Sequence, residues 1–150
     1  MILKLRFWME DLKYRFATQK DAFLLAKMNQ QLIRDEGHRN KMTLLQLERR
    51  MSDFLQTKYA AVIVSSGNDD IGYALYREEP EWVYLRQIFV KSEMRRKGVG
   101  RKIICWLKNN PWKDSKRIRV EVLVGNLEGI SFWHAVGFKD YCITMEMDNQ

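Results

Sequence analysis

The hydrophobic residues change their spacing several times along the chain, and each change marks a predicted element. Residues 13–17, KYRFA, look like a first short strand. Apolar residues three or four positions apart then predict a helix over 18–34 and another over 43–55. Both helices start with a Thr followed three residues later by Asp or Gln, which is the pattern of a capping box.

From residue 59 onward, the spacing of the hydrophobic residues is typical of strands. Residues 59–65 and 71–77 are rich in Val, Ile and small apolar residues, and Gly-Asn-Asp-Asp between them is typical of a turn. A third run, WVYLRQIFV at 82–90, follows a Pro-Glu pair. Because short connections join the three runs, we expect an antiparallel meander.

The C-terminal third alternates between the two periods. It predicts a helix over 99–109 that stops before Pro111, a strand over 117–124, a helix over 126–135 and a last strand over 141–147. A helix that connects two strands makes them parallel. The expected fold is therefore a mixed α/β, mostly antiparallel sheet with helices on both faces, in the order β-α-α-β-β-β-α-β-α-β. It forms one domain over 13–150, preceded by an extension of residues 1–12.

Composition narrows the function classes. The 150 residues carry a net charge of +7, and residues 91–119 alone sum to +9, so the basic character belongs to one region. Such a region attracts nucleic acid or a smaller polyanion. The first 15 residues have charges throughout their apolar run, so we expect no signal peptide, no membrane segment and a cytoplasmic protein. Two cysteines and two histidines encode neither a disulfide framework nor a metal site.

The sequence RRKGVG at 95–100 joins a strand to a helix. The first amides of a helix lack intrahelical partners, and the helix dipole favours an anion there. Cations at this end oppose the dipole, which suits a site for a phosphate group. The segment contains neither GxxxxGK[ST] nor GxGxxG, so it is not a nucleotide P-loop or a Rossmann fingerprint.

RxxGxG after a meander and before an amphipathic helix resembles the pyrophosphate loop of the GCN5-related N-acetyltransferase (GNAT) family. The segment NLEGISFWHAVGF at 126–138 is similar to a second segment of that family, and the order of elements resembles its fold from about Lys13 onward. The resemblance implies an enzyme that uses acetyl-CoA as co-substrate and acetylates a primary amine by direct attack, without a metal.

The resemblance also implies where the cofactor binds. The pantetheine arm would lie along the edge of a splayed strand at Ile88, Phe89 and Val90, with Asn126 facing the cofactor and Phe132 packing beside it. Arg95 occupies the family's Arg/Gln position. The pyrophosphate would be held by the amides of the loop and first helical turn, which belong to Arg96, Lys97, Gly98, Val99, Gly100 and Arg101.

The catalytic groups stay unassigned from the sequence. Many relatives carry a Tyr as general acid directly after Phe132, but this chain has Trp133, whose indole N–H is not an acid at neutral pH. A thiolate is a good leaving group, so the loss of this acid does not forbid the reaction. Tyr84 and Tyr141 are possible substitutes, and Gln87 stands where relatives carry a Glu base.

The acceptor site in such proteins lies partly between the first two helices, where this chain has Asp35, Glu36 and His38. Carboxylates there suit a cationic amine, and a neutral His accepts a proton near pH 7. The predicted acceptor is thus a small molecule or a peptide with an amine group. A solvated loop whose acid caps a helix is the other interpretation of these residues.

Two other functions remain open. An acyl-CoA sensor without turnover would fit Trp133 and the missing carboxylate, and a nucleic-acid-binding module, which we favour least, would fit the basic region. The sequence does not name the acceptor or the acyl chain length. It leaves a homodimer open, because a single C-terminal strand is able to pair with another chain.

Overall fold

The structure is a computed structural model that describes residues 12–150. All but the last residue of the expected N-terminal extension therefore lies outside the described residues.

A five-stranded sheet with the strand order β1-β2-β3-β4-β5 forms the centre of the molecule. Its strands are β1 (Leu12–Phe16), β2 (Tyr59–Ser66), β3 (Asp69–Glu78), β4 (Trp82–Val90) and β5 (Arg117–Val120). The first four pair antiparallel in sequence order, and β5 pairs parallel to β4. The meander and the parallel crossover expected from the sequence are confirmed.

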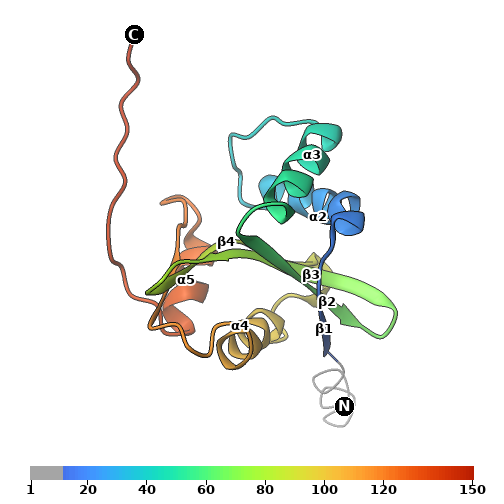
Figure 1. Ribbon diagram of the computed structural model, residues 1–150. Helices are drawn as coiled ribbons and strands as arrows, with labels where there is room; N and C mark the ends of the chain where they lie inside the picture. The colour runs from blue at the N-terminus through green and yellow to red at the C-terminus, as the bar shows by residue number, and fades with distance from the viewer. Residues whose placement is uncertain (1–11) are drawn as a thin grey trace.

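Two pairs of helices cover the two faces of the sheet, as Figure 1 shows. α2 (Ala22–Asp35), after a short 3-10 turn η1 (Gln19–Asp21), and α3 (Leu44–Leu55) lie on one face. α4 (Val99–Asn109) and α5 (Leu127–Ala135) lie on the other, and a second 3-10 turn η2 (Ser92–Met94) precedes α4. The mixed sheet with helices on both faces agrees with the expected fold class.

The helix starts follow the chemistry of their first residues. The Thr43 hydroxyl accepts a hydrogen bond from the Gln46 amide at 3.2 Å, and the Gln46 side chain accepts one from the Thr43 amide at 2.8 Å. At the earlier start, the Asp21 carboxylate accepts a bond from the Thr18 amide at 2.9 Å. These contacts satisfy amides that a helix end otherwise leaves without partners.

Alternate residues of the strands build a separate core on each face. Val62 and Val64 of β2 face α4 and α5, whereas Ala61 and Ile63 face α2 and α3. The side toward α4 and α5 also buries Ile103, Leu107, Trp112 and Trp133, and the side toward α2 and α3 buries Leu25, Met51, Tyr73 and Phe89. A strand that is buried on both faces has no polar alternation, which explains the continuous apolar runs of the meander.

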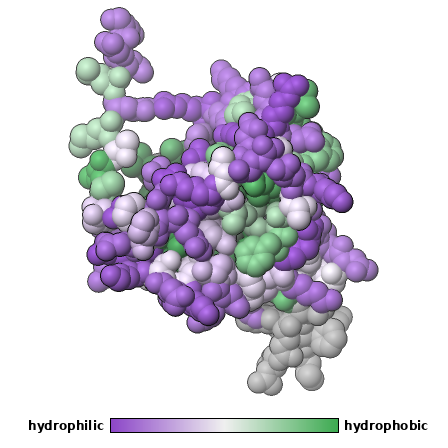
Figure 2. Space-filling model, in the orientation of Figure 1, coloured by the Kyte–Doolittle hydropathy of each residue, from purple (hydrophilic) through white to green (hydrophobic). Residues whose placement is uncertain are grey.

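The last predicted strand does not form. Residues 138–150 follow α5 as an extended tail without strand pairing (Figure 1), and the space-filling view shows the tail standing off the body with hydrophobic side chains along it (Figure 2). β5 is also shorter than the predicted 117–124, because the chain leaves the sheet after Val120. In both cases, the alternating pattern indicates a strand-forming tendency but supplies no partner for it.

No helix within residues 12–150 has the length and apolar character needed to cross a membrane.

A substitution at Gly72 tests the tight contact between β3 and β4. A Cβ at this position would lie 2.3 Å from the carbonyl oxygen of Phe89, which is main chain and has no freedom to move aside. We expect Gly72→Ala to lower the free energy of unfolding by about 1–3 kcal/mol or more, the usual cost of overpacking. Gly125→Ala is the matched control, because its Cβ would meet nothing within 4 Å. Equal urea midpoints for the two variants would contradict the close approach.

Candidate functional site

β4 and β5 run together for only four residue pairs and then part. Their register begins at Trp82 with Arg117 and ends at Leu85 with Val120. β4 itself continues to Val90, and its opposite edge stays paired with β3 up to that residue. The stretch from Gln87 to Val90 therefore has main-chain groups that no β5 residue pairs with.

An irregularity in β4 marks the point of parting. Leu75 pairs with Gln87 and Tyr76 pairs with Leu85, so Arg86 is an extra residue in the ladder. Such a bulge bends its strand and turns its main-chain groups away from the regular direction. Beyond the end of β5, the apolar side chains of Leu123, Val124 and Leu127 are exposed. The gap thus has, along β4, polar main chain that β5 leaves unpaired.

The loop at the end of β4 has an unusual backbone. Arg96 has φ 59°, and it is the one non-glycine residue with positive φ in residues 12–150. Gly98 has φ 76° and is the N-cap of α4. A left-handed arginine costs of the order of 1 kcal/mol or more, and such strain concentrates at ligand-binding loops. The first amides of α4, at Val99 and Gly100, point out of the helix end without intrahelical acceptors.

The two glycines of the loop have different physical roles. A Cβ on Gly98 would meet nothing within 4 Å, so the space in front of this residue is open to a ligand. A Cβ on Gly100 would lie 3.0 Å from Cζ of Phe132, so this glycine makes room for an aromatic ring of α5. The absence of a Cβ at Gly100 therefore serves helix packing, and Gly98 alone has open space in front of it.

Three arginines of the loop region are held by groups of the protein. Arg95 donates from Nε to the carbonyl oxygen of Val90 at 2.8 Å and forms an ion pair with Asp35. Arg96 lies 3.3 Å from Glu128, with both side chains almost fully exposed. Arg101 donates to the carbonyl oxygen of Ala135 at the end of α5, at 2.8 Å. The pairs of Arg95 and Arg96 with carboxylates bring negative groups to the loop from α2 and α5.

Asn126 and Phe132 lie on the other side of the gap, at α5. The Asn126 side-chain oxygen accepts a bond from the Gly129 amide at 3.0 Å and so caps the helix. A Cβ on Gly129 would lie 2.4 Å from Nδ2 of Asn126, which explains the small residue three positions later. Trp133 is buried and packs edge-on against Phe132 and Phe138, so the residue in the family's Tyr position belongs to the core.

The three acceptor candidates lie where α2 ends, but they do not form one cluster of contacts. The carboxylate of Asp35 is engaged by Arg95 and, at 2.8 Å, by Gln31. Burial opposes the ionisation of Asp35, yet these two hydrogen bonds and the Arg95 charge together lower its pKa. Burial and the neighbouring Asp35 charge raise the pKa of Glu36. The amide of His38 donates to the carbonyl oxygen of Ile33 at 3.0 Å, and its side chain is exposed.

A buried polar network lies under α2 and α3 beside the bulge. Tyr73 is fully buried and donates to the side-chain oxygen of Gln87 at 2.8 Å, and burial raises the pKa of its hydroxyl. Asn29, also buried, accepts from Arg50 at 2.8 Å. Arg50 and Arg86 lie 5.7 and 5.0 Å from the centre of the Phe54 ring. This side of the gap therefore carries positive charge, which the sequence did not predict.

Glu121 is a carboxylate at the gap that sequence reasoning missed. It follows directly on the last residue of β5, and Tyr84 pairs with Arg119 in the adjoining register. Burial and the nearby Glu121 raise the pKa of Tyr84. The predicted strand 117–124 contained this residue, but only the early end of β5 shows that it stands where the strands part.

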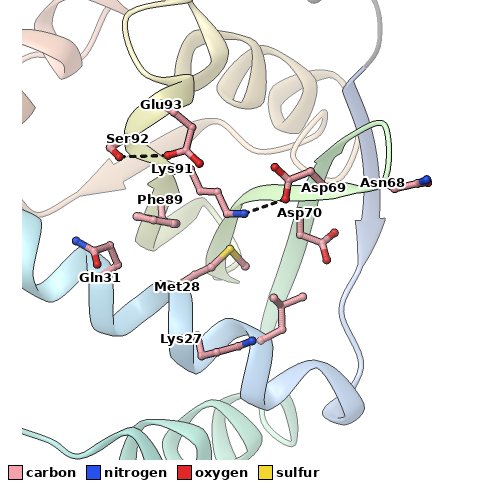
Figure 3. Close-up of a pocket in the computed structure, with 11 residues that line it drawn as sticks. Lys27, Met28, Gln31, Asn68, Asp69, Asp70, Phe89, Lys91, Ser92 and Glu93 are labelled. Atoms are coloured by element: carbon pink, nitrogen blue, oxygen red, sulfur yellow. Dashed lines mark hydrogen bonds and ion pairs between the residues drawn. The ribbon is translucent and has the colours of Figure 1, made fainter.

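A separate pocket of about 490 Å³ opens between α2 and the β2–β3 turn (Figure 3). Lys27, Met28 and Gln31 of α2 face into it, and Lys91 crosses it to bind Asp69 at 2.9 Å. Of the predicted site residues it includes Phe89 but none of the loop amides. Lys91 and Asp69 neutralise each other there, and the N-terminus of α4 does not line the pocket, so the gap and its loop remain the better candidate.

Comparisons with known proteins identify the family of the chain. The protein-family model for the acetyltransferase (GNAT) domain matches residues 57–140, more than half of the chain. A search of curated protein sequences finds no significant match. The chain therefore belongs to the GNAT family of acetyltransferases, and it does so on the stretch that contains the meander, the loop and α5.

Solved structures share the fold at low sequence identity. A possible acetyltransferase from Clostridium difficile 630 superimposes with a TM-score of 0.77 at 19% identity over 93% of this chain and 97% of that one. The aminoglycoside N-acetyltransferase AAC(6')-Iy in complex with CoA gives 0.74 at 16%, over 93% and 95%. A ribosomal-protein-alanine N-acetyltransferase from Brucella melitensis biovar Abortus 2308 gives 0.74 at 12%, over 92% and 99%.

Proposed function

We propose that this protein transfers an acetyl group from acetyl-CoA to a primary amine of a small molecule or peptide, by direct attack within the gap between β4 and β5. One observation carries the proposal. At the end of the unpaired edge of β4, a strained loop presents the amides of a helix N-terminus to open space at Gly98. This combination suits an extended ligand with an anionic end.

The chain's own groups divide into two parts along the gap. The loop amides from Arg96 to Arg101 hold the pyrophosphate, and the edge Ile88–Val90 holds the pantetheine arm through its main chain. Phe132 closes the apolar side against Gly100. When bound, acetyl-CoA supplies an activated thioester. Main-chain amides near the bulge at Arg86 lie where a developing oxyanion needs donors.

Proton transfer falls to acidic groups at the mouth of the gap. An alkyl ammonium loses its proton only at a cost of about 4–5 kcal/mol at pH 7. A nearby base that accepts this proton lowers the free-energy barrier of the reaction. Glu36 has a raised pKa, which makes it a better proton acceptor than an ordinary carboxylate. Asp35 binds the amine less readily than predicted if it stays paired with Arg95. His38 and Glu121 stay candidates for contact with the acceptor.

Two of the structural neighbours are an aminoglycoside N-acetyltransferase and a ribosomal-protein-alanine N-acetyltransferase. This supports an amine acceptor here. At below 20% identity these neighbours do not select between a small molecule and a peptide.

The nucleic-acid alternative loses support from the aromatic residues of the basic region. Trp106 stacks on Tyr14 with ring centres 4.4 Å apart and planes at 4°, and Trp112 is buried against Tyr76. Trp112 is therefore closed to base stacking, and Trp106 is only partly exposed with Tyr14 on one face, whereas single-stranded binders present open aromatic platforms.

A sensor and an enzyme would both bind CoA, but only an enzyme would release free thiol from acetyl-CoA. We expect CoA at a hundredfold excess over its Kd to stabilise the protein by about 2.7 kcal/mol in thermal unfolding. We also expect free thiol to accumulate from acetyl-CoA with at least one member of an amine panel. The exposed Cys105 and Cys142 require subtraction of a protein-only background. Stabilisation without thiol release would establish the sensor, and absence of both would refute the proposal.

Gly98→Glu tests the phosphate loop. The new side chain would place bulk and negative charge in the open space of the loop, and we expect CoA affinity to fall at least a hundredfold. Gly67→Glu is the matched control, since Gly67 also has positive φ, 60°, with nothing within 4 Å, but lies in the β2–β3 turn. Both variants carry the same backbone cost. Isothermal titration that found equal CoA affinities for the two would remove the loop from the cofactor site.

Glu36→Gln tests the acceptor side. We expect kcat/KM for the amine to fall about tenfold, on the order of 1.4 kcal/mol, while the KM for acetyl-CoA stays unchanged. A raised pKa means that Glu36 gains a proton first as the pH falls, so kcat/KM of the native enzyme declines on the acid side earlier than for an ordinary carboxylate. This decline of kcat/KM on the acid side should be absent from the Glu36→Gln variant. Asp114→Asn, far along the chain between α4 and β5, is the control for the loss of one acid.

A further inference from the structure

Two arginines from different elements lie against the same aromatic ring beside the gap. The guanidinium carbon of Arg50, in α3, lies 5.7 Å from the centre of the Phe54 ring, and that of Arg86, at the bulge of β4, lies 5.0 Å from it. Neither arginine forms an ion pair with a carboxylate of residues 12–150. Burial and the charge of Arg86 lower the pKa of Arg50. The pair therefore concentrates positive charge that the described residues do not neutralise.

Most hydrogen-bond donors of the two guanidinium groups have no acceptor within the described part of the chain. Arg50 donates from Nη2 to the side-chain oxygen of Asn29 at 2.8 Å, and its buried Nε has no acceptor there. Arg86 is exposed and donates only to the Tyr59 hydroxyl, at a long 3.5 Å, while Arg77 donates to the same hydroxyl at 2.8 Å. A guanidinium has five donor hydrogens in a planar fork that matches the oxygens of a carboxylate or a phosphate.

A series of polar side chains connects Arg50 with the place where β4 and β5 part. Asn29, which accepts the bond from Arg50, lies beside the hydroxyl of Tyr73. That hydroxyl donates to the side-chain oxygen of Gln87 at 2.8 Å. Gln87 follows Arg86 directly, just beyond the last residue of β4 that pairs with β5. The two arginines therefore belong to the side of the gap that faces α2 and α3.

A carboxylate lies near the same hydroxyl as the arginines. Burial raises the pKa of Tyr73, the charge of Arg50 lowers it, and the charge of Glu36 raises it, so both charged groups are close enough to act on this hydroxyl. Asp35, next to Glu36 at the end of α2, is paired with Arg95 instead. The acceptor side of the gap thus carries an acid at one place and two arginines at another. This arrangement suits a molecule that has both an ammonium group and an anionic group.

Neither CoA nor the nearby acid of the β3–β4 turn is a suitable partner for these arginines. From Arg86 to Val90, β4 advances about 13 Å at the usual rise per residue, and the loop proposed to hold the CoA phosphates lies beyond Val90. In the β3–β4 turn, Glu79 is already paired with Lys58 at 2.9 Å and with Arg77 at 2.8 Å. The group that matches the two arginines therefore belongs to the acceptor.

We propose that the acceptor is a primary amine that also carries an anionic group, a carboxylate or a phosphate, and that Arg50 and Arg86 bind this group while the amine faces the gap. The inference rests on the proposed acetyl transfer and names the class of its acceptor. The Phe54 ring supports both guanidinium groups from one side. An amine with several further positive charges, such as an aminoglycoside, meets repulsion from the same pair.

The first measurement compares amines that differ only in the anionic group. Amino acids are paired with their amides, and phosphoethanolamine is paired with ethanolamine, which separates a carboxylate from a phosphate. We expect kcat/KM to be at least tenfold higher for the anionic member of at least one pair. Arg86→Gln should remove this preference and keep kcat/KM for the neutral member within about twofold. Arg86 is exposed, so the variant should keep its fold by circular dichroism. Arg49→Gln, an exposed position next to Arg50 in α3, is the control for the loss of one positive charge.

The second measurement needs no turnover. In isothermal titration of the protein loaded with CoA, the preferred anionic amine should bind at least tenfold more tightly than its neutral partner, and Arg50→Gln and Arg86→Gln should each abolish the difference. This preference without thiol release from acetyl-CoA would refute the proposed acetyl transfer and still support the anion site. Equal affinities and equal kcat/KM within every pair, no binding of any anionic amine, a preference for aminoglycosides, or a preference that survives in both variants would each overturn the inference.

Discussion

The early parting of β4 and β5 is the constraint on which the rest of the site depends. Parallel strands joined by a helix normally continue side by side, yet here the pairing stops at Leu85 and Val120. The bulge at Arg86 falls at this point, and β3 keeps the outer half of β4 in the sheet. A strand supported on one side only leaves a row of main-chain groups for a ligand. Because the meander is buried on both faces, this edge stays fixed without a ligand.

The loop at the end of that edge is held by packing from both layers of helices. Asp35 of α2 reaches Arg95, and the Phe132 ring of α5 fills the space that Gly100 leaves. Arg101 in turn caps the end of α5. Like charges crowded at a helix N-terminus destabilise it, since they oppose the helix dipole. The carboxylates of Asp35 and Glu128 offset part of this repulsion, and an anionic ligand would compete with them for the same cations.

The local spacing of apolar residues was enough to predict the fold class, and the reason is physical. The spacing of apolar residues in an element shows which of its faces is buried. The helices over 22–35 and 44–55 each have a continuous apolar stripe along one face. The site was less predictable. Asp35 and Arg95 are sixty positions apart, and no local pattern indicates that α2 ends against the loop. Glu121 was hidden within a predicted strand, because only the three-dimensional end of β5 makes it a residue of the gap. The predicted strand 141–147 fails for the same reason, since alternation specifies a face but not a partner.

The shape of the gap depends on β5. This strand has four residues, one partner and a partly buried inner face, so little holds it in place. Short edge strands are the least stable parts of a sheet. β5 nevertheless carries one wall of the gap, and its direction sets how far Glu121 and the apolar side chains beyond it stand from β4.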